Sequence, residues 1–329
     1  MSKWFKFILG IAISIILLLL AFRKVDFGLI LRNFSQVKIG YLISSVLLGM
    51  IILLLRSYRW KQFIEEYKNC KLINFFESIN IGLFFNNILP FRMGDLVQAY
   101  MVSKKTGVPK SLSLSTVLME RFIDLFPPII SIIIGSFFII LPQQVSIILS
   151  VSVLFFLITG VIFIFKFRNL ILHFLGKISS KQKFWLRILS LFKNFYSAID
   201  NFKNVKILMK VIILTLLLWT GYSTGMLLVC YSLNINLPSI WAGYLIQAIT
   251  ALSVVIPSSP GYVGSWEFMG SLALSIFNVE KDKSLSFALL SHFVGMLPVL
   301  IFGLIFVIKE ISLVKKVSKD SIYETNQKI

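Results

Sequence analysis

Charged side chains are scarce in this chain of 329 residues. They make up 14% of it, whereas about 25% is usual for a soluble globular protein. Hydrophobic residues make up 57%, with 31 phenylalanines, and several apolar runs reach the roughly 18 residues that a helix needs to cross a bilayer. Such runs are too long for the short, alternating strands of a membrane β-barrel. The composition therefore predicts an all-α polytopic membrane protein.

Residues that commonly build metal sites and disulfides are also few. The two cysteines, Cys70 and Cys230, lie far apart in unlike contexts and suggest no disulfide framework or cysteine metal site. The two histidines, His173 and His292, form no paired motif of the kind that holds zinc. We therefore expect no metal and no cofactor.

Acidic residues number 14 against 33 basic ones, which gives a net charge of +19. A basic excess can indicate nucleic-acid binding. In membrane proteins, however, lysine and arginine gather in cytoplasmic loops and attract anionic lipid headgroups. Membrane lipids are therefore the expected partners, and nucleic acid is not.

Six apolar runs are long enough to be full transmembrane helices, and two further apolar segments are interrupted. The full runs are residues 4–22, 40–56, 122–141, 145–166, 210–233 and 284–308, and the interrupted segments are 74–104 and 240–278. The prediction is about six transmembrane helices plus two re-entrant helical hairpins. Because the first run follows a basic start and lacks a small-residue cleavage site, it is expected to be a retained span.

The basic residues also predict the orientation. If both termini are cytoplasmic, 27 of the 33 lysines and arginines fall on the cytoplasmic side, as the positive-inside rule requires. The predicted location is the plasma membrane. We expect one membrane-embedded domain followed by a short polar tail, and the domain divides into two halves with an amphipathic cytoplasmic linker. The ranges are 1–312 for the domain, 313–329 for the tail, 1–141 and 145–308 for the halves, and 167–209 for the linker.

Each half contains three crossings and one interrupted segment, so the two halves should have opposite topology. Inverted repeats with broken helices at matching positions are a recurrent plan among transporters, whose sites lie near the breaks. The two breaks share a sparse pattern of proline, glycine and acid, from Pro90 to Asp95 and from Pro257 to Glu267. This pattern favours an inverted repeat.

The first break lies in "NNILPFRMGDLVQAY", which begins at Asn86. Pro90 stops one arm and Gly94 permits a turn. Arg92 lies at the tip, where its planar guanidinium suits a phosphate, and Asp95 is expected to cap the returning helix. Irregular backbone at membrane depth survives inside protein or beside a wet cavity, and an exposed helix start attracts anions. The alternative is an ordinary loop between two short spans.

The second break lies in "IPSSPGYVGSWEF". Two prolines stop its first arm, two glycines permit a tight turn, two serines offer hydroxyl groups, and an acid lies in the returning arm. These residues are Pro257, Pro260, Gly261, Gly264, Ser258, Ser259 and Glu267. An ordinary loop again remains the alternative.

The third polar cluster lies in "VLMERFIDLFPP". Glu120 and Asp124 share a helix face, and Arg121 can meet either acid along that helix. Charges at this depth usually pair or line a polar cavity, although an ion pair at headgroup level is the alternative. Arg56 and Arg59, near the end of an apolar run, are expected to extend toward lipid headgroups.

His292 lies inside the last apolar run. We expect it to be a packed polar residue rather than part of a proton relay.

Four motifs carry a resemblance to a known family. "LLLRSYRW", "NNILPFRMGDLVQAYMVSKKTGV", "STVLMERFIDL" and "IPSSPGYVGSWE", in this order and spacing, resemble the flippase-like membrane domain of the lysylphosphatidylglycerol synthase family over roughly residues 5–312. The resemblance implies that the family's polar positions correspond to Arg59, Asn86, Pro90, Arg92, Gly94, Asp95, Glu120, Arg121, Asp124, Pro257, Pro260, Gly261, Gly264 and Glu267. Asp95 stands where the family often has glutamate.

The resemblance implies lipid handling. Full-length synthases add a soluble domain that transfers lysine to phosphatidylglycerol, and about 20 polar residues after the last span leave no room for it. We therefore expect a lipid translocase without lysyltransferase activity, acting on an aminoacylated phospholipid, a polyprenyl phosphate or a lipid-linked sugar. Arg92 and Arg121 would bind phosphate, and the carboxylates of Asp95, Glu120, Asp124 and Glu267 would orient them or bind a cationic group or proton.

Two other classes stay open. A membrane-embedded transferase could use Asp95 and Glu120 as base or metal ligand on a lipid-linked substrate. A non-catalytic membrane protein could instead position a phosphatidylglycerol lysyltransferase, a lipid-modifying synthase or a glycosyltransferase through the basic segment 166–210.

Overall fold

The computed structural model describes residues 3–23, 25–65, 67–138, 166, 168, 172–173, 183–200, 204–254, 256 and 259–326. Regular structure in these ranges is helical, without a strand, as expected for the predicted all-α class. The helices are α1 (Lys3–Phe22), α2 (Phe27–Ser35), α3 (Ile39–Ile64), α4 (Leu72–Ile88), α5 (Gly94–Thr106), α6 (Lys110–Ile123), α7 (Phe126–Phe138), α10 (Lys183–Asp200), α11 (Val205–Ser232), α12 (Ile240–Ala251), α13 (Ser265–Ser275) and α14 (Lys281–Asn326). Short 3-10 turns occur at η1 (Pro90–Arg92), η3 (Leu252–Val254) and η4 (Pro260–Tyr262).

Three helices in this part of the chain are long and apolar enough to cross a membrane. They are Ile39–Ile64, Val205–Ser232 and Lys281–Ser312, and they correspond to three of the six predicted spans, 40–56, 210–233 and 284–308. Shorter apolar helices occupy Gly10–Phe22 and Ile240–Val254. The predicted span 122–141 begins at the junction of α6 and α7, and nearly all of the predicted span 145–166 lies outside the described residues.

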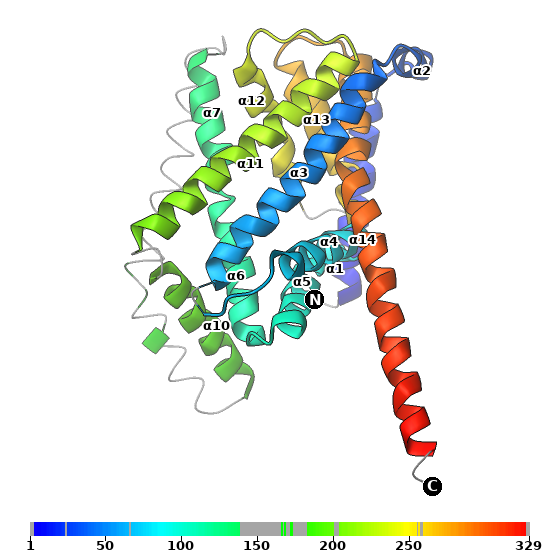
Figure 1. Ribbon diagram of the computed structural model, residues 1–329. Coiled ribbons are helices and arrows are strands. Elements are labelled where there is room, and N and C mark those ends of the chain that lie inside the picture. Colours follow the sequence, from blue (N-terminus) through cyan, green and yellow to red (C-terminus); the bar gives the residue numbers. More distant parts are fainter. Residues whose placement is uncertain are drawn as a thin grey trace.

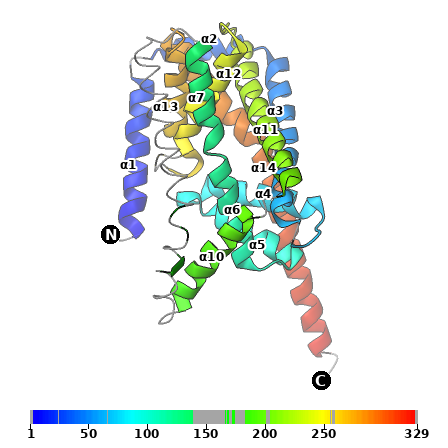
Figure 2. The same cartoon turned by 90° about the vertical axis from the view of Figure 1, so that its left-hand side faces the viewer.

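The long helices α3 and α11 lie side by side, and α14 packs along α3 (Figure 1). The α4–α5 pair, α6 and α10 gather toward the end where α3 terminates, whereas α2 and α12 lie toward the opposite end (Figures 1 and 2). The N- and C-termini are at the same end as α10 in both views. Helix α10, which makes up most of the described part of the predicted linker 167–209, packs on α6.

The α4–α5 pair crosses at two glycines. A Cβ atom built at Gly82 would lie 2.5 Å from the Gln98 Cβ, and one built at Gly94 would overlap the Gly82 carbonyl oxygen. The two helix backbones can approach this closely because neither glycine carries a side chain. This crossing brings Asn86, near the end of α4, beside the start of α5.

The two interrupted segments meet each other. Turn η4 packs against α4, and a Cβ built at Gly261 would lie 3.4 Å from the Asn87 carbonyl oxygen. Helix α1 contacts the second break, because the Ser259 backbone N–H donates to Ser14 Oγ at 2.6 Å. Gly264 has φ +90° and faces the Ser14 backbone, so a side chain at Gly264 would be both strained and obstructed.

A network of ion pairs ties the C-terminal part of α14 to the α4–α5 pair. Lys105 on α5 donates to Glu77 on α4 at 2.6 Å and also to Glu310 on α14. Lys309 donates to Glu77 at 2.6 Å, and Lys104 donates to Glu310 at 3.0 Å. Helix α14, which is distant in the sequence, is therefore fixed to the α4–α5 pair at one end of the molecule.

Candidate functional site

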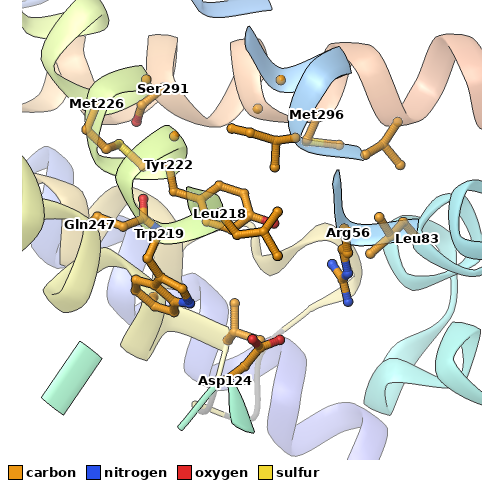
Figure 3. Close-up of a pocket in the computed structure, with 18 of the residues that line it drawn as sticks. Arg56, Leu83, Asp124, Leu218, Trp219, Tyr222, Met226, Gln247, Ser291 and Met296 are labelled. Carbon is orange, nitrogen blue, oxygen red and sulfur yellow. The ribbon is translucent and has the colours of Figure 1, made fainter. Parts of the chain in front are cut away.

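A cavity of about 520 Å³ lies between α3, α11, α14 and the two breaks. Figure 3 shows Arg56 and Asp124 in one part of it and Met226 and Ser291 farther away, with Tyr222 between them. Both breaks contribute to the wall. The charged side chains among its described lining residues are four arginines and one aspartate, namely Arg56, Arg59, Arg92, Arg121 and Asp124. The remaining wall is mainly apolar.

Helix α3 contributes two arginines that are held by carboxylates of α6. Arg59 is 1% exposed and forms a bidentate pair with Asp124 at 2.7 and 3.0 Å. Arg56 Nε donates to Glu120 at 2.8 Å, and Glu120 also accepts from Arg59 at 3.3 Å. The expectation that these arginines extend toward headgroups is therefore wrong. They turn inward because Glu120, itself fully buried, offers an opposite charge inside the protein.

Arg121 does not use the neighbours that its own helix offers. It donates to Asp95 on α5 at 3.1 Å from Nε and 2.8 Å from Nη2. The predicted pairing with Glu120 or Asp124 is therefore wrong. Both carboxylates are instead engaged by the arginines of α3, and the α5 carboxylate gives Arg121 a two-point contact.

Asp95 is likewise not the predicted helix cap. Helix α5 begins at Gly94, its cap position is Met93, and no side chain caps it. The Asp95 carboxylate accepts from Arg121 and, at 2.9 Å, from Asn86 Nδ2. Its position in the first turn still places a negative charge at the positive end of the helix dipole.

Arg92 lies at the tip of the first break, as predicted, and its side chain lines the cavity. Its backbone has φ +54°, which is uncommon for a residue other than glycine. The Arg92 Nε lies 3.6 Å from the nearer Asp95 oxygen, and its side chain is 33% exposed. This is an ion pair without a hydrogen bond.

Three guanidinium nitrogens at this end of the cavity have no hydrogen-bond partner among the described residues. They are Arg56 Nη2, Arg59 Nε and Arg92 Nε, and all three are shielded from solvent. A buried donor without a partner costs about 1–3 kcal/mol. An anionic ligand with several acceptor oxygens would relieve this cost.

Helices α13 and α14 bring a carboxylate and a histidine together beside the second break, and the histidine, His292, lines the cavity. Glu267 Oε2 accepts from the Gly264 backbone N–H at 2.6 Å, so this acid caps the start of α13. Its Oε1 contacts His292 Nδ1 at 2.6 Å. His292 is buried, a position common to a packed polar residue and to a proton relay.

The remaining predicted residues of the second break lie apart from the cavity or outside the described residues. Pro260 opens η4, and Gly261 adopts φ +69° within it. The Ser259 hydroxyl donates to the Val263 carbonyl oxygen at 3.1 Å and is not among the described lining residues. Pro257 and Ser258 lie outside the described residues.

Sequence reasoning did not select Arg56, Gln98 or Tyr222 for the site. Gln98 approaches Glu120 at 3.4 Å, and Tyr222 lines the cavity from α11. A signal for Arg56 was present: it lies three residues before Arg59, so both share one helix face. The acids of α6, four residues apart, form a matching pair. No comparable signal marked Gln98 or Tyr222.

Broken helices that meet beside a buried, arginine-lined cavity define a polytopic helical membrane protein with an internal polar site. The chain belongs to the family described as the lysylphosphatidylglycerol synthase TM region, which matches residues 7–303. This result confirms the family predicted from the four motifs.

The chain is similar to curated membrane proteins of the UPF0104 group. One from Methanocaldococcus jannaschii is 27% identical over 316 residues, covering 89% of this chain and 91% of the relative. A second from the same organism is 28% identical over 243 residues, covering 71% and 97%. A relative from Pyrococcus horikoshii is 23% identical over 328 residues, covering 93% and 96%. No solved structure matches the chain.

Proposed function

We propose that this protein is a lipid translocase that holds the phosphate-bearing headgroup of a lipid in the arginine-lined cavity. The observation that carries the proposal is the set of three shielded guanidinium nitrogens without a partner among the described residues. They lie in a cavity whose charged lining is predominantly positive. Arginine suits phosphate because its planar fork can make two parallel hydrogen bonds to it.

Of the four cavity arginines, Arg92 and Arg121 have the most exposed side chains and are the most accessible to an entering phosphate. Each is partly exposed, whereas Arg56 and Arg59 are buried against the acids of α6. In the proposed mechanism Asp95 holds these two arginines apart from the other carboxylates. The lipid headgroup, whether anionic or zwitterionic, enters the cavity while its hydrocarbon chains stay in the bilayer. An aminoacylated phospholipid, a polyprenyl phosphate and a lipid-linked sugar share this phosphate chemistry.

The proposed topology has six spans and two re-entrant hairpins. The protein is proposed to lie in the plasma membrane with both termini in the cytoplasm. Two features support it: the termini lie at one end (Figure 2), and the interrupted segments contact one another at Gly261 and Asn87. An inverted repeat would place one break on each side of the cavity. Rocking of one half against the other would then expose the headgroup to the two membrane faces alternately.

Labelling of single cysteines in intact cells tests this topology. In a background with Cys70 and Cys230 replaced by alanine, we expect a membrane-impermeant maleimide to label Asn236→Cys directly. Lys110→Cys should react only after the cells are permeabilised. Both positions are exposed, so accessibility depends on the membrane side. The reverse labelling pattern would show that the proposed orientation is wrong.

An embedded transferase is the second candidate and is less well supported. Its proposed base or metal ligands, Asp95 and Glu120, are held in ion pairs with arginines. Glu120 is fully buried. A carboxylate in this position is poorly placed to accept a proton from a substrate. Translocation without an enzymatic step therefore stays the proposed activity. The proposed kind of partner is a lipid-modifying synthase or a glycosyltransferase.

Proteoliposomes containing fluorescent phosphatidylglycerol test the headgroup site. We expect the wild-type protein to move this lipid between leaflets faster than empty vesicles do. Arg92→Lys keeps the charge but loses the two-point geometry, so translocation should fall about tenfold. This corresponds to the loss of about 1.4 kcal/mol, close to the lower limit of about 1.5 kcal/mol for a hydrogen bond to a charged group. Arg92→Ala should abolish it. Fluorescent diacylglycerol, which lacks phosphate, should move equally in vesicles with and without the protein.

The matched control is Arg32→Lys, at an exposed position of α2 far from the cavity lining. It should leave translocation unchanged. Equal rates for wild type and Arg92→Lys would show that Arg92 acts only as a positive charge. Absence of translocation by the wild type with the phosphate-bearing probe would contradict the proposed function itself.

A further inference from the structure

His292 faces a hydrogen-bond acceptor from each of its two ring nitrogens. Nδ1 lies 2.6 Å from Glu267 Oε1, and Nε2 lies 2.8 Å from the Gly261 carbonyl oxygen. The histidine comes from α14, and both acceptors come from the second break or the helix that follows it. The indole ring of Trp266 stacks on the imidazole with 5.3 Å between ring centroids, so the ring is held in this orientation.

This arrangement requires one more proton than a neutral histidine beside an ionised carboxylate can supply. A backbone carbonyl can only accept, so His292 Nε2 carries a hydrogen. Nδ1 and Glu267 Oε1 then need a second hydrogen between them. It resides on the imidazole, as a histidinium–carboxylate pair, or on the carboxyl group. Without it, two lone pairs would face each other at 2.6 Å.

Among the described residues, no other group lies within hydrogen-bonding distance of the pair and could supply this hydrogen. The second carboxylate oxygen of Glu267 already accepts from Gly264. Besides His292, the titratable or charged side chains that line the same cavity are Arg56, Arg59, Arg92, Arg121, Asp124, Tyr222 and Tyr262. On α4, Glu77 is paired with lysines near the other end of α14. No hydrogen bond joins any of these groups to His292 in the described part of the chain.

We propose that Glu267 and His292 together form a proton-binding site, and that this proton is the coupling ion of the proposed lipid translocation. The coupling role rests on the proposed function, whereas the proton-binding site itself does not. In the bound state the pair has no net charge. When the proton leaves to water, the pair becomes negative and the neutral imidazole keeps a single N–H, so only one of its two hydrogen bonds, to Glu267 or to Gly261, can remain.

Release of the proton acts on the second break through its backbone. The same two side chains hold the Gly261 carbonyl and the Gly264 N–H. Gly261 in turn packs against Asn87 of the first break. A change in protonation therefore alters the contact between the two breaks, which is the contact that alternating exposure has to open.

Histidine NMR tests the bound proton without any lipid assay. In a His173→Asn background, ¹⁵N-histidine labels His292 alone, because the chain has two histidines. At pH 7.5 a free imidazole would be about 10% protonated and a free glutamic acid less than 1%. We expect most molecules of the purified full chain to retain the proton. It should be seen either as a doubly protonated imidazole or as the infrared carbonyl band of a protonated Glu267. A neutral His292 beside an ionised Glu267 would overturn the proposal.

Glu267→Gln is a closely matched variant. The glutamine oxygen can accept from Gly264, and its amide N–H can donate to His292 Nδ1, so both contacts persist with a neutral imidazole and no transferable proton. We expect the protonation signal to be lost in this variant. The control Glu65→Gln, at an exposed position, should leave it unchanged. Retention of the full signal in Glu267→Gln would overturn the assignment to this pair.

Coupling has its own test. Proteoliposomes with fluorescent phosphatidylglycerol and a difference of one pH unit across the membrane should accumulate the lipid in one leaflet. The direction should reverse when the gradient is reversed. Glu267→Gln should lose this gradient dependence. Equal distribution by wild type in both gradients would refute coupling. Because the NMR result does not depend on transport, failure of the proton site and failure of the proposed function are distinguishable.

Discussion

Glu120→Gln is expected to destabilise the protein by about 3–5 kcal/mol, the range found when one partner of a buried ion pair is removed. The Glu120 carboxylate is fully buried and accepts hydrogen bonds from both Arg56 and Arg59. Glutamine keeps the size of the side chain but removes its charge. Two adjacent buried guanidinium groups would then share Asp124, which is itself partly exposed.

The measurement is the unfolding free energy of the purified protein in detergent or bicelles. A surface change, Glu65→Gln, provides the control, because Glu65 is exposed and its ion pair with Lys61 lies at the surface, where such pairs contribute about 0–1 kcal/mol. Adding Arg56→Met to Glu120→Gln should restore part of the loss, since it removes one of the uncompensated charges. A Glu120→Gln variant as stable as the control would show that the network is not structural.

Gly94→Ala is expected to be the most damaging single-methyl change, at about 3 kcal/mol or more. A Cβ atom there would overlap the Gly82 carbonyl oxygen and lie 2.5 Å from the Asn86 backbone nitrogen. Overpacking usually costs about 1–3 kcal/mol, and here the obstacle is backbone that cannot change rotamer. The α4–α5 pair would have to separate, which would also displace Asn86 from Asp95.

Gly40→Ala is the matched control for this prediction. Gly40 lies in the first turn of α3, where an added Cβ atom would have nothing within 4 Å of it. Alanine favours helix over glycine by about 0.5–1 kcal/mol, so this change should be neutral or slightly stabilising. Gly94→Ala should therefore lower the stability and Gly40→Ala should not, although each substitution adds one methyl group. Equal thermal stability of the two would show that the glycine crossing does not limit the approach of α4 and α5.

The sequence was sufficient to predict what depends on local pattern. Long apolar runs predicted α3, α11 and α14, because a run of that length has few alternatives to a spanning helix. Proline and glycine predicted the positions of both breaks, since each acts on the backbone of its own segment. The four motifs also predicted the family.

Ion-pair partners could not be predicted in the same way. Arg121 has two acids on its own helix, but its partner is Asp95, brought to it by the turn at the first break. Local spacing favours partners that are close in the sequence. In the folded protein, an arginine instead pairs with a carboxylate that packing brings to it and that no other arginine already binds. Arg59 takes Asp124, 65 residues away, and thereby removes it from Arg121.

The prediction that Asp95 caps a helix was wrong for a related reason. A carboxylate near a helix start can cap it or bind a cation, and the two uses have the same local signature. Asp95 has an arginine within reach and binds it, whereas Glu267 has the Gly264 N–H and a histidine. The choice depends on neighbours contributed by α6 and α14, which no local window includes.

The inward position of Arg56 and Arg59 has a consequence for the biogenesis of the protein. Ribosomes make α3 before α6, so both arginines leave the translocation channel about 64 and 65 residues ahead of their acids, Glu120 and Asp124. An arginine without a partner is costly in the hydrocarbon layer, by about 2.5–3.5 kcal/mol at the centre of an inserting helix. Arg56 and Arg59 lie toward the end of α3, so we expect them to stay among the lipid headgroups until α6 is made. Glu120 and Asp124 would then draw both arginines inward, and α3 and α6 would complete their insertion together.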